Sequence, residues 1–260
     1  PMTTAFWRGL ISGSLIFLVL IFSKGIKVFR PVIGSGYAGL FYILLIGSTT
    51  PAFVLAVTYT SVANVVFIFA SIPIFALIFS FIFLNEKILL STLLTSLIVI
   101  IGLAIIAYGS KTSEISSWKG DVWALYVSAA YAGALTSLRK VKEISMVPTV
   151  PIAFLGSSLI IFLFHYPFGD LDEKLIFYLL HGFFIGIASW LLTLGPRYLS
   201  SPEVSLLILL ETVFAPILVW LVIGEFPGHL AIIGGSLIIV TLFIFNLFKL
   251  LKENNSVSKY

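Results

Sequence analysis

The chain has 260 residues, of which 60% are hydrophobic and only 10% are charged, and its formal net charge is +4. Average soluble chains carry about 25% charged residues, so this composition excludes a soluble globular protein and indicates a polytopic membrane protein. The small net charge gives no indication of nucleic acid binding, and the lack of cysteine excludes disulfides, thiol catalysis and cysteine metal sites.

Nine apolar stretches are each long enough to cross a hydrocarbon core of about 30 Å as a helix. In chain order they cover 3–22, 35–57, 62–84, 89–108, 121–138, 148–166, 174–195, 202–223 and 229–249. The connections between them are short, so almost no protein is left outside the bilayer. We therefore predict an all-α integral membrane fold with about nine transmembrane helices.

The positive charges predict the orientation of these spans. Nine alternating spans place one group of basic residues on a single side: Lys24, Lys27, Arg30, Lys87, Arg139, Lys140, Lys142, Arg197, Lys249, Lys252 and Lys259. The other side receives only Lys111, Lys119 and Lys174. The positive-inside rule therefore predicts a cytoplasmic C-terminus.

The two halves of the chain resemble each other at an offset of 139 positions. Without a gap, the second half aligns residues 198–225 with residues 59–86 of the first, and the matches include Tyr59 with Tyr198 and Glu86 with Glu225. In the predicted topology these stretches run in opposite directions, which is typical of the inverted repeats of transporters. We therefore expect a first repeat over 1–110 and a second over 111–260.

Three segments carry a resemblance to a known family. "YTSVANVVFIFASIPIFALIFSFIFLNEKI" at 59–88, "YLSSPEVSLLILLETVFAPILVWLVIGE" at 198–225 and "PMTTAFWRG" at 1–9 resemble segments of EamA-type transporters of the drug/metabolite transporter superfamily. One departure is Glu211-Thr212, where the family usually has Glu-Pro.

The resemblance implies a ten-helix fold of two inverted five-helix repeats that moves small metabolites across a bacterial-type plasma (inner) membrane. It aligns 1–110 with helices 2–5 of that fold and 111–260 with helices 6–10. We therefore expect that this chain lacks the first helix.

Arg8 and Glu211 are the most informative ionisable residues within the predicted spans. At about 1.5 Å per residue, Glu211 lies about 13 Å beyond Pro202, close to the midplane, and Arg8 lies about 10 Å from the outer end of its span. Burying a charge there is costly, so such residues are usually paired or functional. Two interpretations stay open: a structural ion pair between helices, or a carboxylate that binds substrate or a proton.

Other polar and aromatic residues suit a substrate pocket. The candidates are Tyr59, Asn64, Tyr131, Trp190 and Thr193. Trp190 is the preferred aromatic because Ser189 and Thr193 lie near it in mid-span, although Tyr and Trp also form interfacial belts. Pro51, Pro73 and Pro216 lie inside spans, where a proline frees a backbone carbonyl and can bend the helix.

These features favour a secondary transporter for a small organic metabolite, amino acid-like or drug-like, that works by alternating access. A channel-like or purely structural membrane protein is the alternative. An intramembrane enzyme is less favoured, because the sequence has no H-E-x-x-H motif and no close pair of aspartates lies within a predicted span. We expect no cofactor and no metal, with the lipid bilayer and a small-molecule substrate as partners; proton coupling and oligomer formation stay open.

Overall fold

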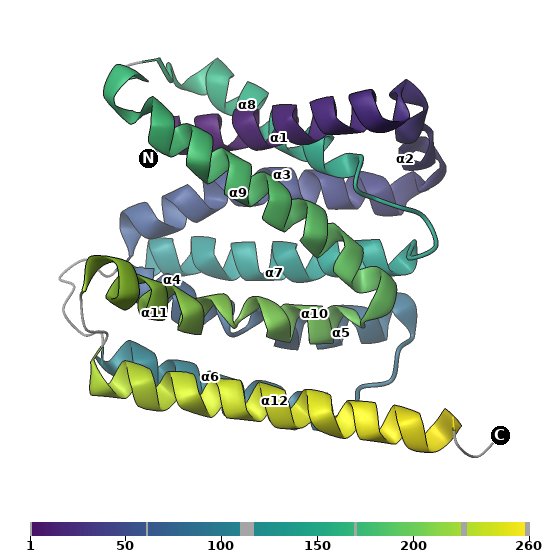
Figure 1. The fold of residues 1–260 in the computed structure, drawn as a ribbon, viewed down its shortest axis with the longest axis vertical. Coiled ribbons are helices and arrows are strands. Elements are labelled where there is room, and N and C mark those ends of the chain that lie inside the picture. Colours follow the sequence, from purple (N-terminus) through teal and green to yellow (C-terminus); the bar gives the residue numbers. More distant parts are fainter. Residues whose placement is uncertain (1, 61, 110–116, 169–170, 225–227, 258–260) are drawn as a thin grey trace.

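The computed structural model describes residues 2–60, 62–109, 117–168, 171–224 and 228–257, and these ranges are helical without any strand. Most helices lie side by side with roughly parallel axes, and α9 crosses the others obliquely (Figure 1). The helices are α1 (Met2–Lys24), the short 3-10 helix η1 (Ile26–Phe29), α2 (Arg30–Gly34), α3 (Gly36–Tyr59), α4 (Val62–Phe69), α5 (Ile72–Leu84), α6 (Leu90–Gly109), α7 (Trp118–Lys140), α8 (Thr149–Phe164), α9 (Leu171–Tyr198), α10 (Ser201–Ile208), α11 (Glu211–Ile223) and α12 (His229–Val257).

Six helical segments within the described residues are long and apolar enough to cross a membrane. They are Met2–Lys24, Gly36–Tyr59, Asn64–Leu84, Leu90–Tyr108, Leu175–Tyr198 and His229–Phe248. The predicted all-helical membrane fold is therefore confirmed, but the count of nine spans is not.

Three of the nine expected spans account for the difference, each for a physical reason. The stretch 148–166 contains the apolar but short α8, Thr149–Phe164. The stretch 202–223 is divided between α10 and α11. The stretch 121–138 lies in α7, whose buried positions are largely alanine, glycine, serine and threonine. Such small residues give a helix low hydropathy but allow close packing on its neighbours α3, α4, α5, α9 and α10.

Two of the expected spans are interrupted near their middle. The helix over 62–84 breaks between Phe69 and Ile72, and Pro73 lies in the first turn of α5. A proline there has no N–H and clashes with the carbonyl four residues earlier, that of Phe69, which explains this break. Pro51 and Pro216 lie within the continuous helices α3 and α11, and the side chain of Pro216 is outside the described ones.

The second interruption falls at the equivalent position of the other half. Helices α4 and α10 begin at Val62 and Ser201 and end at Phe69 and Ile208, so both boundaries are displaced by 139 positions. The backbone hydrogen bonds at the breaks correspond as well: Ser71 N–H donates to Ile68 O over 2.9 Å, and Leu210 N–H donates to Leu207 O over 3.1 Å.

The same displacement relates further boundaries of the two halves. Helices α5 and α11 each end at a residue in the left-handed region, Asn85 with φ 55° and Gly224 with φ 80°. Helix α6 starts at Leu90 and α12 at His229. In Figure 1 the two helices of each corresponding pair run in opposite directions. These shared boundaries relate parts of the two halves, and the division into repeats 1–110 and 111–260 stays a prediction.

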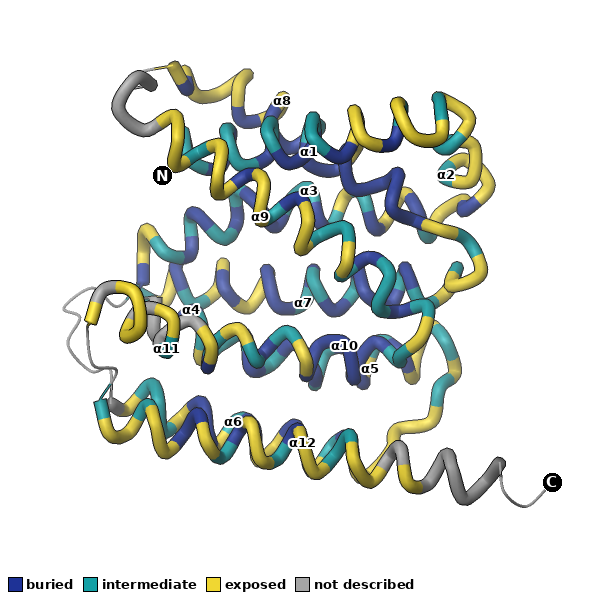
Figure 2. Tube along the Cα trace, viewed as in Figure 1, coloured by how far each residue is buried: buried dark blue, intermediate teal, exposed yellow. Residues whose placement is uncertain are grey.

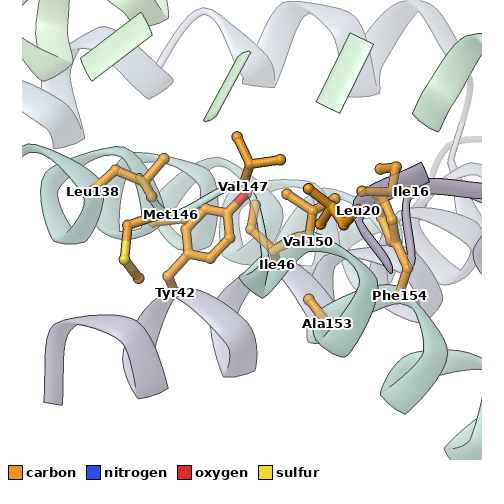
Figure 3. Close-up of a cluster of buried hydrophobic side chains, with 11 residues drawn as sticks. Ile16, Leu20, Tyr42, Ile46, Leu138, Met146, Val147, Val150, Ala153 and Phe154 are labelled. Atoms are coloured by element: carbon orange, nitrogen blue, oxygen red, sulfur yellow. The ribbon is translucent and has the colours of Figure 1, made fainter. Parts of the chain in front are cut away.

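The buried residues concentrate where α1, α3, α7 and α8 meet, whereas α9, α11 and α12 carry mainly exposed residues (Figure 2). The largest core cluster joins side chains from these four helices and from the α7–α8 connection, at the end where α7 terminates (Figure 3). Exposed apolar residues on the outer helices are expected in a bilayer, because lipid is as apolar as they are.

Glycine allows the closest contact between the two halves on the outer side of the bundle. Helices α6 and α12 lie side by side, and a Cβ atom on Gly102 would stand only 3.0 Å from the carbonyl oxygen of Gly234. A larger residue at either position would push the two helices apart.

Candidate functional site

A cavity of about 540 Å³ lies in the middle of the bundle, between the two helix breaks. Phe69 and Ile72, which flank the first break, line the cavity. Ile208 and Leu210, which flank the second break, line it as well. The remaining lining comes from α1, α3, α7, α8, α9 and the ends of α10 and α11. We call this space the central cavity. A smaller space of about 210 Å³ between α6, α11 and α12 has an almost wholly apolar lining, so the central cavity is the better candidate site.

Arg8 and Glu211 both line the central cavity, on α1 and at the first position of α11. The side-chain Nε of Arg8 is buried and has no hydrogen-bond partner among the described residues. Glu211 is exposed and begins α11. Within the described part of the chain no ion pair joins the two side chains. A role of Glu211 in binding substrate or a proton stays a prediction.

Tyr131 and two threonines supply the nearest hydroxyl groups. Tyr131 projects from α7 and lies within electrostatic range of both Arg8 and Glu211. Thr49 and Thr50 line the cavity from α3, directly before Pro51. The hydroxyl of Thr49 donates to the carbonyl of Ile46 over 2.7 Å, whereas the buried hydroxyl of Thr50 has no partner in the described ranges.

The rest of the lining is mainly apolar and rich in aromatic residues. Phe53, Phe69, Phe154 and Phe214 come from four different helices and surround the polar groups. A pocket with apolar walls and a few convergent polar groups is the usual form of a small-molecule site. Sequence reasoning did not single out these phenylalanines, because nothing distinguishes them from the other phenylalanines of an apolar chain.

The structure separates the other predicted site residues from the central cavity. Thr193 is buried, shares a hydrogen bond of 3.0 Å with Tyr42 and donates to Ser189 O over 2.6 Å. Trp190 packs against the core cluster of Figure 3. In place of Trp190, its neighbour Ser189 lines the cavity.

The last two candidates lie near the end of α3. Tyr59 is 42% exposed, and the amide of Asn64 donates to the hydroxyl of Thr60 over 3.2 Å. Neither is among the described residues that line the central cavity. A role for either in binding substrate stays a prediction.

A missed group of residues joins three helices at the end that carries most of the basic residues. The Nε of Arg139 donates to a carboxylate oxygen of Glu86 over 3.1 Å, and its Nη1 donates to the carbonyl of Pro196 over 3.1 Å. Arg197 Nε also donates to Lys142 O over 3.0 Å. We call the first set, Glu86, Arg139 and Pro196, the end clamp. It ties α7 to the ends of α5 and α9.

A further cavity, of about 430 Å³, lies next to the end clamp. Its lining includes Glu86 and Arg139 of the clamp, together with Lys87 and Glu203. Glu203 also accepts a hydrogen bond of 3.0 Å from the Ser200 backbone N–H, as expected of an acidic residue in the first turn of a helix. Arg139 directly follows Leu138, a member of the core cluster, so the clamp adjoins both this cavity and the cluster.

Comparisons with known proteins place the whole chain in one group. A sequence model of the EamA-like transporter family matches residues 1–108 and 118–247. A search of curated proteins finds no match, whereas 27 chains of solved structures match. One of them, a crystal structure of a protein, is 15% identical in sequence and has a TM-score of 0.73. The aligned region covers 95% of this chain and 88% of the other chain. At that identity the likeness shows the fold alone.

Proposed function

The chain belongs to the EamA-like transporter family, and from this premise we propose that it is a secondary transporter that moves a small organic metabolite across the membrane. The metabolite is amino acid-like or drug-like, and the transporter works by alternating access. Membership in the family and the apolar helices make it a multi-pass membrane protein. We propose the plasma (inner) membrane as its location, with the C-terminus in the cytoplasm and export as the direction.

One observation carries the proposal: the central cavity lies where both interrupted helices break, and Arg8, whose buried Nε has no hydrogen-bond partner among the described residues, lines it together with Glu211. Interrupted helices at the interface of inverted repeats are the usual place of the substrate site in secondary transporters. The two breaks leave short segments, α4 with α5 and α10 with α11, that can turn relative to each other without unfolding a helix.

The end clamp supports the alternating-access part of the proposal. It joins α5, which lies in the first predicted repeat, to α7 and α9 of the second. A bond between the repeats at one end closes that end while it persists, and its opening would let the repeats tilt. Because the clamp lies among the basic residues that the positive-inside rule predicts to be cytoplasmic, we propose that the intact clamp corresponds to a state closed on the cytoplasmic side.

Membership in the family also suggests transport and not catalysis. The described lining of the central cavity offers an arginine, a carboxylate and several hydroxyls to a solute. A proton could still move with the substrate through Glu211.

Counterflow in proteoliposomes tests the proposed function. The purified chain is reconstituted in vesicles loaded with a high concentration of one unlabelled solute, and entry of a labelled trace of the same solute is measured. A transporter shows saturable, transient accumulation above equilibrium, whereas a channel shows neither saturation nor accumulation. Amino acids and cationic drugs form the solute panel, and protein-free vesicles are the blank.

A pair of tryptophan variants makes the test specific for the central cavity. Ala188 lines the cavity on α9, and Leu180 on the same helix is half exposed and outside it. Ala188→Trp is expected to lower counterflow at least tenfold by filling the cavity, and Leu180→Trp is expected to leave it unchanged. Equal rates in the two variants would show that solute does not pass through this space.

A further inference from the structure

We infer that the connection between α1 and α3 binds an anionic phospholipid, whose phosphate lies among basic side chains and whose acyl chains lie against apolar ones. The connection lies beyond the end of α1, at the end of the bundle toward which the C-terminus points (Figure 1). We call this surface the connection patch, and it comprises Lys24, Ile26, Lys27, Arg30, Ile33 and Tyr37. The lipid is a second ligand, outside the central cavity, and its binding does not depend on the proposed function.

The charge of the patch is the first step of the argument. Lys24, Lys27 and Arg30 are exposed, and no described carboxylate forms an ion pair with them. The sequence has no acidic residue before Glu86, so the charged residues of 1–85 are all positive. A 3-10 helix such as η1 has three residues per turn, which places Lys27 and Arg30 on the same side of the chain. Basic residues next to a membrane attract anionic headgroups, and an arginine can bond a phosphate through two N–H groups at once.

The apolar residues between these charges are the second step. Ile26 is 71% exposed, Ile33 is 85% exposed and Tyr37 is 82% exposed. Segments that carry basic and apolar side chains together lie at the boundary between headgroups and acyl chains. A free phosphate ion would leave these apolar side chains uncovered, whereas the acyl chains of a phospholipid cover them. The patch therefore fits a lipid better than it fits a soluble anion.

The connection is held in place from its inner side, which is the third step. Gly25 with φ 69° and Gly36 with φ 56° bound it, and this left-handed region favours glycine. Between them Val28 and Phe29 pack against the core cluster, and Ser35 is buried. A backbone fixed in this way loses little conformational freedom when a ligand binds, so less of the binding free energy is spent on ordering the site.

The α7–α8 connection provides a contrast at the same end of the bundle. Its Lys142 lies next to Glu143, so the two charges offset each other, and residues 141–148 include no exposed large apolar side chain. The carbonyl of Lys142 accepts a hydrogen bond of 3.0 Å from Arg197 Nε. Basic residues occur in both connections, but the connection patch combines them with exposed apolar side chains.

Native mass spectrometry of the purified chain tests the inference. Phosphatidylglycerol and phosphatidylcholine with the same acyl chains are added separately to the protein in detergent, and the dissociation constant of the first bound lipid is measured. We expect phosphatidylglycerol to bind about fivefold more tightly or better, because its headgroup carries a net negative charge. Excess inorganic phosphate, compared with chloride at the same ionic strength, should not displace it.

Charge variants assign this preference to the patch. Lys27→Gln combined with Arg30→Gln is expected to bring the two lipids to within about twofold of each other. Lys140→Gln combined with Lys142→Gln also removes two exposed positive charges at this end and should leave the preference unchanged. Ile33→Gln should weaken both lipids about threefold and keep the preference, because an exposed isoleucine contacts acyl chains and not the headgroup.

A photoreactive phosphatidylglycerol locates the site on the unaltered chain, so the inference can be decided even if a variant fails to fold. Its cross-links should fall on residues 24–37 more often than on 141–148, and a phosphatidylcholine with the same probe should label 24–37 less. Equal binding of the two lipids overturns the inference, and so does an equal loss of preference in the two double variants. Displacement by inorganic phosphate overturns it in favour of a site for a soluble anion.

Discussion

At the scale of single residues, the contrast between Ser189 and Trp190 shows how a site is assembled on a helix. The two are neighbours in sequence, yet Ser189 lines the central cavity and Trp190 packs into the core. Successive residues of a helix point about 100° apart, since 3.6 residues make one turn. A single step along α9 therefore leads from the wall of the central cavity to the core.

Glu211 provides the sharpest prediction at this scale. Glu211→Gln keeps the shape of the side chain and removes its charge, so folding is expected to stay intact while flux falls at least tenfold. The remaining flux is expected to lose its dependence on pH, because no other carboxylate lines the described part of the cavity. The measurement is flux against pH, normalised to folded protein.

The outcome separates two roles of the carboxylate. A staple between helices would give misfolded protein, with normal flux in whatever protein survives. A pH profile like that of the unaltered chain would remove Glu211 from the mechanism. Glu143→Gln, which changes an exposed glutamate outside the cavity, is the control for the loss of one negative charge.

Thr50 gives a second prediction for a single side chain. Thr50→Val replaces a buried hydroxyl that has no partner in the described ranges with a methyl group of similar size. Loss of an unsatisfied polar atom should leave thermal stability unchanged or raise it slightly. Counterflow should weaken a few-fold if the hydroxyl binds substrate. A matched change at Thr49, whose hydroxyl is bonded to Ile46 O, should instead lower stability.

At the scale of elements, the helix breaks and the end clamp have different roles in the proposed transport cycle. The breaks supply short segments beside the cavity, and the clamp holds the ends of α5, α7 and α9 together. Arg139 is suited to this because its planar guanidinium can bond a carboxylate and a carbonyl at once. The clamp is partly exposed, with side-chain accessibilities of 20% for Arg139 and 32% for Glu86, so its contribution is small enough for the bond to open.

Cysteine labelling tests the end clamp. The natural chain has no cysteine, so Ser189→Cys places a single thiol at the cavity wall. Adding Glu86→Gln should raise the rate at which an impermeant maleimide reaches this thiol from the basic side of the membrane. Loss of about 1 kcal/mol from a partly exposed pair corresponds to an increase of roughly fivefold. Inside-out vesicles present that side to the reagent.

Two comparisons guard the interpretation. Glu143→Gln in the Ser189→Cys background should label at the same rate as its parent. A Glu86→Gln variant that labels no faster than the parent would show that the pair does not hold this end closed. The same thiol is expected to become less accessible from the opposite side of the membrane. A larger fraction of molecules open on the basic side leaves a smaller fraction open on the other side.

At the scale of the whole molecule, the correspondence between the halves is the dominant feature. Helix boundaries recur at a displacement of 139 positions in α4 and α10, and in α5 and α11. The corresponding helices run in opposite directions (Figure 1), and residues beside both breaks line the same cavity. Two similar halves in opposite orientations can exchange conformations, which gives a simple route to two access states.

The predicted orientation can be tested on intact cells. Lys142 lies in the α7–α8 connection and Tyr166 in the α8–α9 connection, and both are exposed. An impermeant maleimide should label Tyr166→Cys and leave Lys142→Cys unlabelled until the membrane is opened. The reverse pattern would place the C-terminus outside and contradict the positive-inside prediction.

The sequence alone determined the membrane class, the apolar stretches and the offset between the halves, and it predicted a role for Arg8 and Glu211. These follow from hydropathy and from the cost of a charge in lipid, which depend on local composition. It did not show that Tyr131 and Thr50 share a cavity with Arg8, that Trp190 and Thr193 lie outside it, or that Arg139 bonds Glu86. Only the tertiary structure decided these points, because they depend on how each helix is rotated about its own axis and where it meets its neighbours.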